Sequence, residues 1–102
     1  MKLSEIKAQI VTSFRKFDPE KIILFGSIAR DDWDEESDVD IIIVYETDKR
    51  FLDRLKELYM GWDIPKAVDI LAYTPTEFTE MLSDNYFLQD AIKDGEMIYE
   101  RS

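Results

Sequence analysis

Apolar side chains near the start of the chain return every three or four positions, which is the repeat of one helix face. Lys and Glu occupy the opposite face, and the residues of the apolar stripe are Leu3, Ile6, Ile10, Phe14 and Phe17. Ser4 can cap the start of this helix. Asp18-Pro19 ends it, because the residue before a proline is disfavoured in helical conformation.

Other apolar residues come in short continuous runs, which have the length of buried strands rather than the period of a helix. Three such runs and one shorter run predict strands, at 21–25, 39–45, 67–73 and 96–99. Residues 31–37, between the first two runs, are polar and strongly acidic. We expect an exposed loop there, with Trp33 as its apolar group.

A second helix is predicted between the strands at 39–45 and 67–73. Thr47 or Asp48 starts it, and Gly61 ends it. Its expected core face consists of Phe51, Leu52, Leu55, Leu58 and Tyr59.

Two more helices follow the third strand. Thr74 to Glu77 form a capping box with Pro75 at the first helical position, which predicts a short helix through Leu82. A last helix is expected at 85–93, before Gly95.

The order of these elements predicts an α/β fold. The first two strands are separated by only about a dozen residues, which is short for a crossover helix, so a mixed sheet is expected rather than a parallel one. We therefore predict a small mixed β-sheet of three to four strands flanked by helices. With 102 residues, the chain is expected to be a single domain, 1–102.

Composition limits the chemistry. The chain contains no cysteine and no histidine, so a disulfide, a thiolate nucleophile and a histidine base are excluded. Carboxylates, hydroxyls, Lys and Arg remain. A net charge of −10 argues against direct nucleic-acid binding, and no apolar stretch is long enough to span a membrane. We expect a cytoplasmic protein, and the sequence leaves a homo-oligomer open.

The candidate site lies around the acidic loop. Gly26-Ser27 follows a predicted strand and puts a flexible residue where backbone could approach a phosphate; an ordinary strand-to-helix turn is the alternative. Asp38 and Asp40 stand two apart at a strand start, so both can face one pair of hard cations. The alternative is the solvated end of an acidic loop.

Asp69 interrupts the apolar run at 67–73. We expect this strand to be buried, where an unpaired carboxylate would cost several kcal/mol. A metal held by Asp38 and Asp40 would compensate the charge. An edge-strand position or an ion pair with Lys66 is the alternative.

These residues together form a recognisable pattern. The segments GSIAR at 26–30 and SDVDI at 37–41 resemble the GSxARG…SDxDL signature of the minimal nucleotidyltransferases, small members of the polymerase-β-like superfamily. Asp69 falls where that family has its third strand carboxylate, so the resemblance covers nearly the whole chain. One residue departs from the pattern: Asp31 stands where the family has glycine, and could bring negative charge near the phosphates.

The resemblance implies a polymerase-β-like nucleotidyltransferase core and a role for each motif residue. Gly26 and Ser27 would hold the β- and γ-phosphates of ATP. Asp38 and Asp40 would bind two Mg²⁺ ions, and Asp69 would complete the metal site and take a proton from the acceptor hydroxyl. Arg30 would stabilise the departing pyrophosphate, with a salt bridge to the acidic loop as the alternative.

For the acceptor, the resemblance implies a partner protein. Family members of this size are typically antitoxins of HEPN-domain ribonuclease toxins and transfer AMP to a tyrosine hydroxyl of the toxin. An acidic chain suits docking on such a basic, RNA-binding partner. Two hypotheses follow: an AMP-transferring enzyme, favoured by the three carboxylates, or an antitoxin that neutralises by occlusion, favoured by Asp31.

Overall fold

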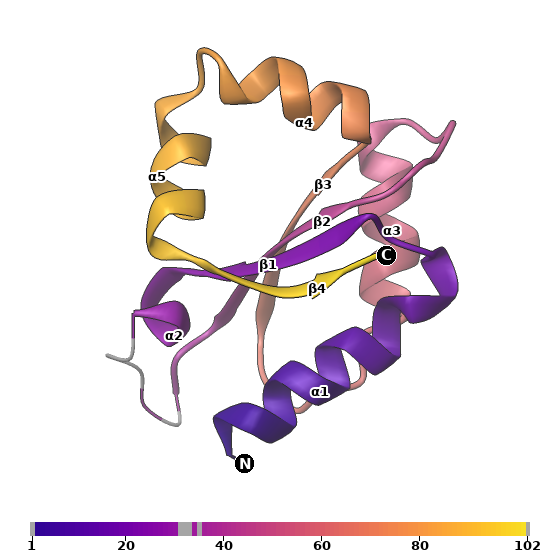
Figure 1. The fold of residues 1–102 in the computed structure, drawn as a ribbon. Helices are drawn as coiled ribbons and strands as arrows, with labels where there is room; N and C mark the ends of the chain where they lie inside the picture. The colour runs from indigo at the N-terminus through magenta and orange to yellow at the C-terminus, as the bar shows by residue number, and fades with distance from the viewer. Residues whose placement is uncertain (1, 31–33, 35, 102) are drawn as a thin grey trace.

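The computed structural model describes residues 2–30, 34 and 36–101. Its elements, in chain order, are α1 (Leu3–Phe14), the 3-10 turn η1 (Arg15–Phe17), β1 (Lys21–Phe25), α2 (Gly26–Ala29), β2 (Val39–Val44), α3 (Phe51–Met60), β3 (Val68–Tyr73), α4 (Pro75–Leu82), α5 (Tyr86–Asp94) and β4 (Glu96–Glu100). Figure 1 shows how they surround one sheet. None of the helices in this described part of the chain is long and apolar enough to cross a membrane.

The four strands form one mixed sheet in the order β3-β2-β1-β4. β1 pairs antiparallel with both β2 and β4, whereas β2 and β3 run parallel. The mixed α/β sheet expected from the short first connection is therefore confirmed. β3 and β4 are the edge strands, and this position decides the environment of the residues on β3.

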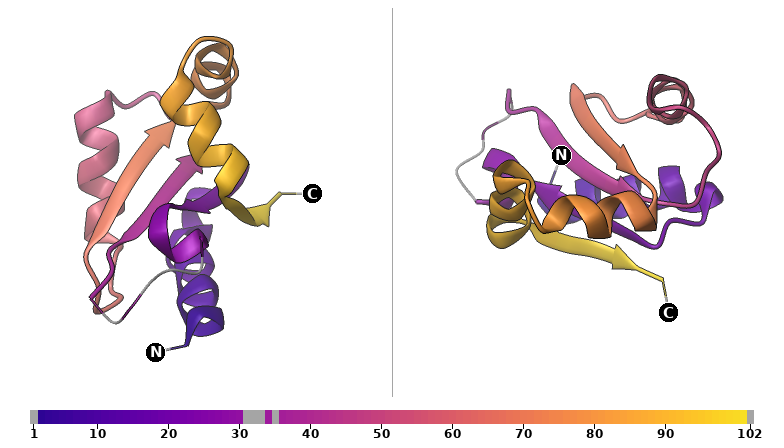
Figure 2. Two further views of the ribbon diagram at one scale, coloured as in Figure 1. Left: turned by 90° about the vertical axis from the view of Figure 1, so that its left-hand side faces the viewer. Right: turned by 90° about the horizontal axis from the view of Figure 1, so that it is seen from above.

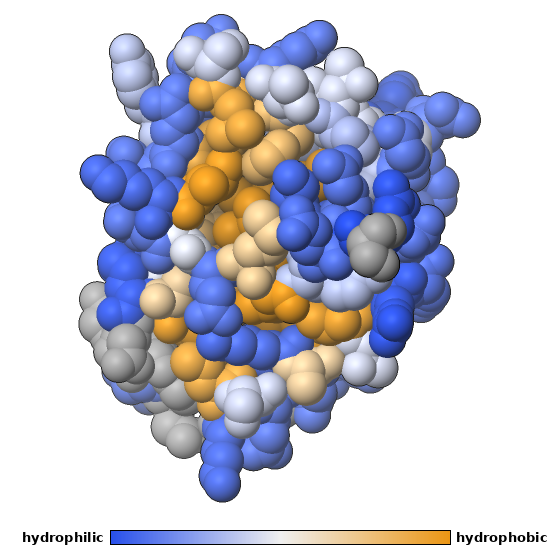
Figure 3. All heavy atoms as spheres, viewed as in Figure 1, coloured by the Kyte–Doolittle hydropathy of each residue, from blue (hydrophilic) through white to orange (hydrophobic). Residues whose placement is uncertain are grey.

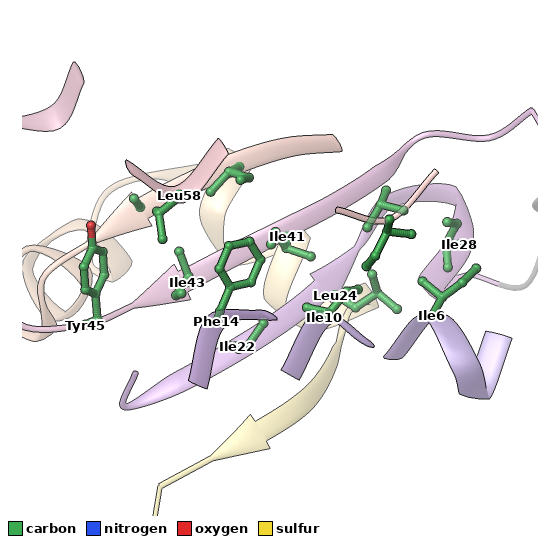
Figure 4. Close-up of a cluster of buried hydrophobic side chains, with 14 residues drawn as sticks. Ile6, Ile10, Phe14, Ile22, Leu24, Ile28, Ile41, Ile43, Tyr45 and Leu58 are labelled. Atoms are coloured by element: carbon green, nitrogen blue, oxygen red, sulfur yellow. The ribbon is translucent and has the colours of Figure 1, made fainter. Parts of the chain in front are cut away.

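The sheet buries both faces against helices, because its central strands are continuously apolar. On one face, α1 and α3 cover alternate residues of β1 and β2; Figure 4 shows Phe14 of α1 beside Ile41 and Ile43 of β2. On the other face, α4 and α5 cover the intervening residues, through Phe78 and Leu88 among others. Figure 2 shows α3 and α4 on opposite sides of the sheet.

The start of the first helix differs from the prediction. α1 begins after Lys2, whose backbone N–H donates to the Glu5 carboxylate at 3.2 Å, so the cap predicted at Ser4 is wrong. The carboxylate three residues on satisfies the helix start in place of a hydroxyl.

The predicted start of the second helix is also wrong. α3 begins after Arg50, because the Thr47 hydroxyl accepts the Lys49 N–H at 3.1 Å and closes a turn there.

The expected core face of α3 is only partly correct. Leu58 is buried and Leu55 is half-buried, but Phe51, Leu52 and Tyr59 are exposed. Arg54 is buried in their place. The reason is that α3 packs beside an edge strand, which presents backbone polar groups as well as apolar side chains.

Arg54 ties three elements together. Its guanidinium pairs with the Glu77 carboxylate of α4 at 2.6 and 3.1 Å and donates to the backbone oxygens of Lys49 and Ala72. Glu77 also accepts the Thr74 N–H, which completes the predicted capping box of α4.

Candidate active site

The parallel pairing of β2 and β3 brings two carboxylates side by side. Asp40 on β2 is in register with Asp69 on β3, and with Phe25 on β1 on its other side. Residues in register across neighbouring strands point to the same face of the sheet, so both carboxylates leave the face that carries α4 and α5. Residues some thirty positions apart in the sequence thus meet in one row.

The surroundings of Asp40 shift the pKa of its carboxyl group. Its pKa is raised to about 6, first because it is partly buried and then because Asp69 and Asp38 stand near it. Arg30 acts in the opposite direction. A carboxyl group crowded by other carboxyl groups favours either a proton or a cation, so the row is a natural cation site.

The burial expected for Asp69 is wrong. Asp69 is exposed, because β3 is an edge strand and α4 and α5 cover the sheet only beyond the carboxylate row. The partly buried acid is Asp40, on the central strand β2. The need for a compensating cation therefore lies with Asp40.

Gly26 makes room for this carboxylate. It begins α2 with φ of +77°, a conformation that other residues rarely adopt. A Cβ on Gly26 would lie 2.2 Å from Oδ2 of Asp40. The absence of a side chain is thus required both by the backbone conformation and by the close approach of the Asp40 carboxylate.

The rest of α2 holds the motif in place. Ile28 is buried in the core and anchors this four-residue helix, while Ser27 is half-buried and Arg30 is exposed. Arg30 and Gly26 line an open pocket of about 210 Å³. Its opposite wall is α5, through Phe87 and Asp90.

The residues fit a hard divalent cation in their chemistry. Carboxylate oxygens are the ligands that Mg²⁺ prefers, and it commonly takes only one or two from the protein, with phosphate and water completing the shell. Asp40 and Asp69 supply such a pair. Within the described residues, no group of three or more acidic side chains stands close enough together to hold a metal. Asp38 is exposed and lies near enough to Asp40 to act on its charge.

Two residues near the site were not expected there. Tyr59 of α3 places its hydroxyl against the backbone of β3 on both sides of Asp69. Phe87 of α5 packs edge-on against Phe25, with 6.1 Å between ring centroids, and is nevertheless 62% exposed. The helical repeat assigns such residues to a core, and no local signal marks them otherwise. Asp31 and Trp33 lie outside the described residues.

Comparison with known proteins finds similar sequences and a similar fold. The profile of the family described as Polymerase beta, Nucleotidyltransferase matches residues 8–102. Protein adenylyltransferase MJ0435 of Methanocaldococcus jannaschii is 34% identical over 74 residues, which make up 72% of this chain and 80% of that protein. Protein adenylyltransferase MJ0141 of the same organism is 51% identical over 70 residues, or 68% of this chain and 69% of that protein.

A solved structure shares the fold. A toxin–antitoxin crystal structure with AMP-PNP contains a chain that superposes with a TM-score of 0.67 at 20% identity, covering 94% of this chain and 74% of that chain. At this identity the likeness concerns the fold alone. The mixed sheet with flanking helices is therefore the polymerase-β-like nucleotidyltransferase fold expected from the motifs.

Proposed function

The chain belongs to the polymerase beta nucleotidyltransferase family, as a minimal nucleotidyltransferase, and on this premise we propose that it transfers AMP from ATP to a hydroxyl of a partner protein. The observation that carries the proposal is the row formed by Asp40 and Asp69 beside Gly26. Phosphate transfer needs positioning and charge neutralisation more than a histidine base, and this chain has no histidine.

Each candidate site residue has a proposed task. Asp38, Asp40 and Asp69 hold Mg²⁺, which when bound would neutralise phosphate charge and lower the pKa of the acceptor hydroxyl. Gly26 and Ser27 hold the β- and γ-phosphates.

The transfer itself needs a group that accepts a proton and a positive charge beside the leaving pyrophosphate. Asp69 takes the proton as the acceptor oxygen forms its bond to the α-phosphorus. The bond from the α-phosphorus to the bridging oxygen breaks, and Arg30 stabilises the pyrophosphate that leaves.

The acceptor is proposed to be a tyrosine of a HEPN-domain toxin in the cytoplasm. The names of the relatives and the fold shared with a toxin–antitoxin chain support a protein acceptor. The surface agrees, since Tyr86 and Phe87 of α5 are 80% and 62% exposed and Asp90 and Asp94 follow them on the same helix. In Figure 3, apolar side chains also reach the surface between α4 and α5. Such a surface suits a basic partner.

The test is to incubate the protein with Mg²⁺, ATP and the product of its neighbouring gene, and to weigh that partner by mass spectrometry. A gain of one or more AMP units that disappears in Asp69→Asn and Asp38→Asn supports the enzyme. Asp84→Asn is the matched control, because Asp84 is an exposed acid in the α4–α5 connection. If the partner is inhibited without a gain in mass, the protein neutralises by occlusion and the transfer reaction is refuted.

A further inference from the structure

The outer edge of β3 is closed by side chains of α3. In a parallel pair, alternate residues of an edge strand turn their backbone groups away from the neighbouring strand. Ala67 and Tyr73 donate or accept toward β2, as the bonds Val39 N–H to Ala67 oxygen and Tyr45 N–H to Tyr73 oxygen show. The backbone groups of Val68 and Ile70 therefore point outward, where the described residues form no further strand.

The Tyr59 side chain forms hydrogen bonds with these outward backbone groups. Its hydroxyl donates to the Val68 backbone oxygen and accepts the Ile70 N–H, both at 3.2 Å. Arg54, further along α3, donates to the Ala72 backbone oxygen at 3.4 Å and so continues the same cover. Figure 2 shows α3 standing beside β3 along its length.

The two bonds of Tyr59 enclose one residue. The Val68 oxygen belongs to the peptide group before Asp69, and the Ile70 N–H belongs to the peptide group after it. The other side of Asp69 is held by its register with Asp40 on β2. The backbone angles φ and ψ of Asp69, which set the direction in which its Cα–Cβ bond leaves the strand, are consequently restrained from both sides.

This restraint is needed because Asp69 is the second residue of an edge strand. Strand ends and edges open most readily, and an exposed carboxylate has no packing to hold its direction. We propose that Tyr59 is a positioning residue for Asp69, which keeps that carboxylate aimed at Asp40 and at the acceptor. The inference rests on the proposed function, in which Asp69 activates the acceptor hydroxyl.

The test is Tyr59→Phe, which keeps the ring and removes only the hydroxyl. Tyr99→Phe is the matched control, because Tyr99 lies on β4, the opposite edge strand of the sheet. The substitution removes both bonds of the hydroxyl, and loss of the one that the Ile70 N–H donates corresponds to a change of about fivefold in local opening. We expect amide exchange at Ile70 to become about fivefold faster, with exchange at Ile42 of the central strand unchanged.

The kinetic readout separates positioning from a general structural role. We expect kcat for AMP transfer to fall about tenfold in Tyr59→Phe, with KM for ATP within twofold of the parent. ATP is proposed to bind mainly at Gly26 and Ser27 of α2, and not at the backbone groups of β3 that Tyr59 contacts. The Tyr99→Phe control should leave kcat, KM and the exchange rates at Ile70 and Ile42 unchanged.

The outcomes distinguish the two proposals. If Asp69→Asn abolishes transfer but Tyr59→Phe changes neither kcat nor Ile70 exchange, the positioning role is overturned and the proposed function stands. An equal loss of kcat and of ATP affinity in Tyr59→Phe also overturns it, because the effect would then be general. If Asp69→Asn itself transfers AMP normally, the assignment of Asp69 fails first.

Discussion

Replacing Gly26 with alanine should damage the fold and the site together. The φ of +77° at this position costs a residue with a side chain about 1 kcal/mol. The new Cβ would lie 2.2 Å from Oδ2 and 3.1 Å from Cγ of Asp40, so the carboxylate must move. A shift of the Asp40 carboxylate by about 1 Å off its rotamer costs about another 1 kcal/mol.

The expected loss of unfolding free energy in Gly26→Ala is therefore about 2–3 kcal/mol. For a domain of this size, that corresponds to a decrease of about 10–15 °C in Tm, measured by circular dichroism. Displacement of one carboxylate of the row by about 1 Å should lower the rate of AMP transfer about 100-fold, measured by mass gain of the partner.

Gly61→Ala provides the matched control. Gly61 has φ of −86°, and its nearest contact for an added Cβ is the Leu58 oxygen at 3.5 Å, so Tm and rate should stay near those of the parent. A double-mutant cycle with Asp40→Ala isolates the contact, since the cost of Gly26→Ala should fall to about 1 kcal/mol when the carboxylate is absent. If Gly26→Ala melts within about 2 °C of the parent and retains its rate, the steric reasoning is refuted.

Three further predictions concern charge and docking. Asp40→Asn should abolish AMP transfer yet stabilise the metal-free protein by about 1 kcal/mol in urea unfolding. The pKa of Asp40 in the folded protein, about 6, exceeds the ordinary 3.8, so the parent should lose stability as pH rises from 4 to 6 and the variant should not. Equal dependence of the unfolding free energy on pH in both proteins would contradict this. Glu77→Gln should lower the free energy of unfolding by about 3 kcal/mol, because it leaves the charge of Arg54, whose side chain is only 9% exposed, without its partner. Arg54→Met should lower it about half as much, because the Glu77 side chain is 42% exposed and its carboxylate can be solvated. Equal losses would count against this asymmetry. Phe87→Ala should weaken partner binding at least about tenfold by calorimetry, and unchanged binding would exclude α5 from the docking surface.

Local sequence patterns were sufficient to predict most elements of the fold. The strands β1, β2 and β3 lie within one residue of the predicted apolar runs, and α4 has the predicted capping box. The two motifs around the acidic loop, with Asp69, were also sufficient to identify the family. The strands, the helix and each motif depend on residues close together in the chain, where apolar period, proline and glycine act directly.

Which strand lies at the edge was decided only by the tertiary structure. An apolar run such as 67–73 looks the same whether its strand has one neighbour or two. The sequence therefore placed Asp69 in the interior, assigned Tyr59 to a core face and left Arg54 without a role. Because β3 pairs with β2 on one side only, Asp69 is exposed, and the partly buried Asp40 is the residue whose pKa is raised. Polar side chains of α3 then contact the backbone groups of β3 that no strand pairs. Strand order results from contacts between distant segments, and local periodicity carries no information about it.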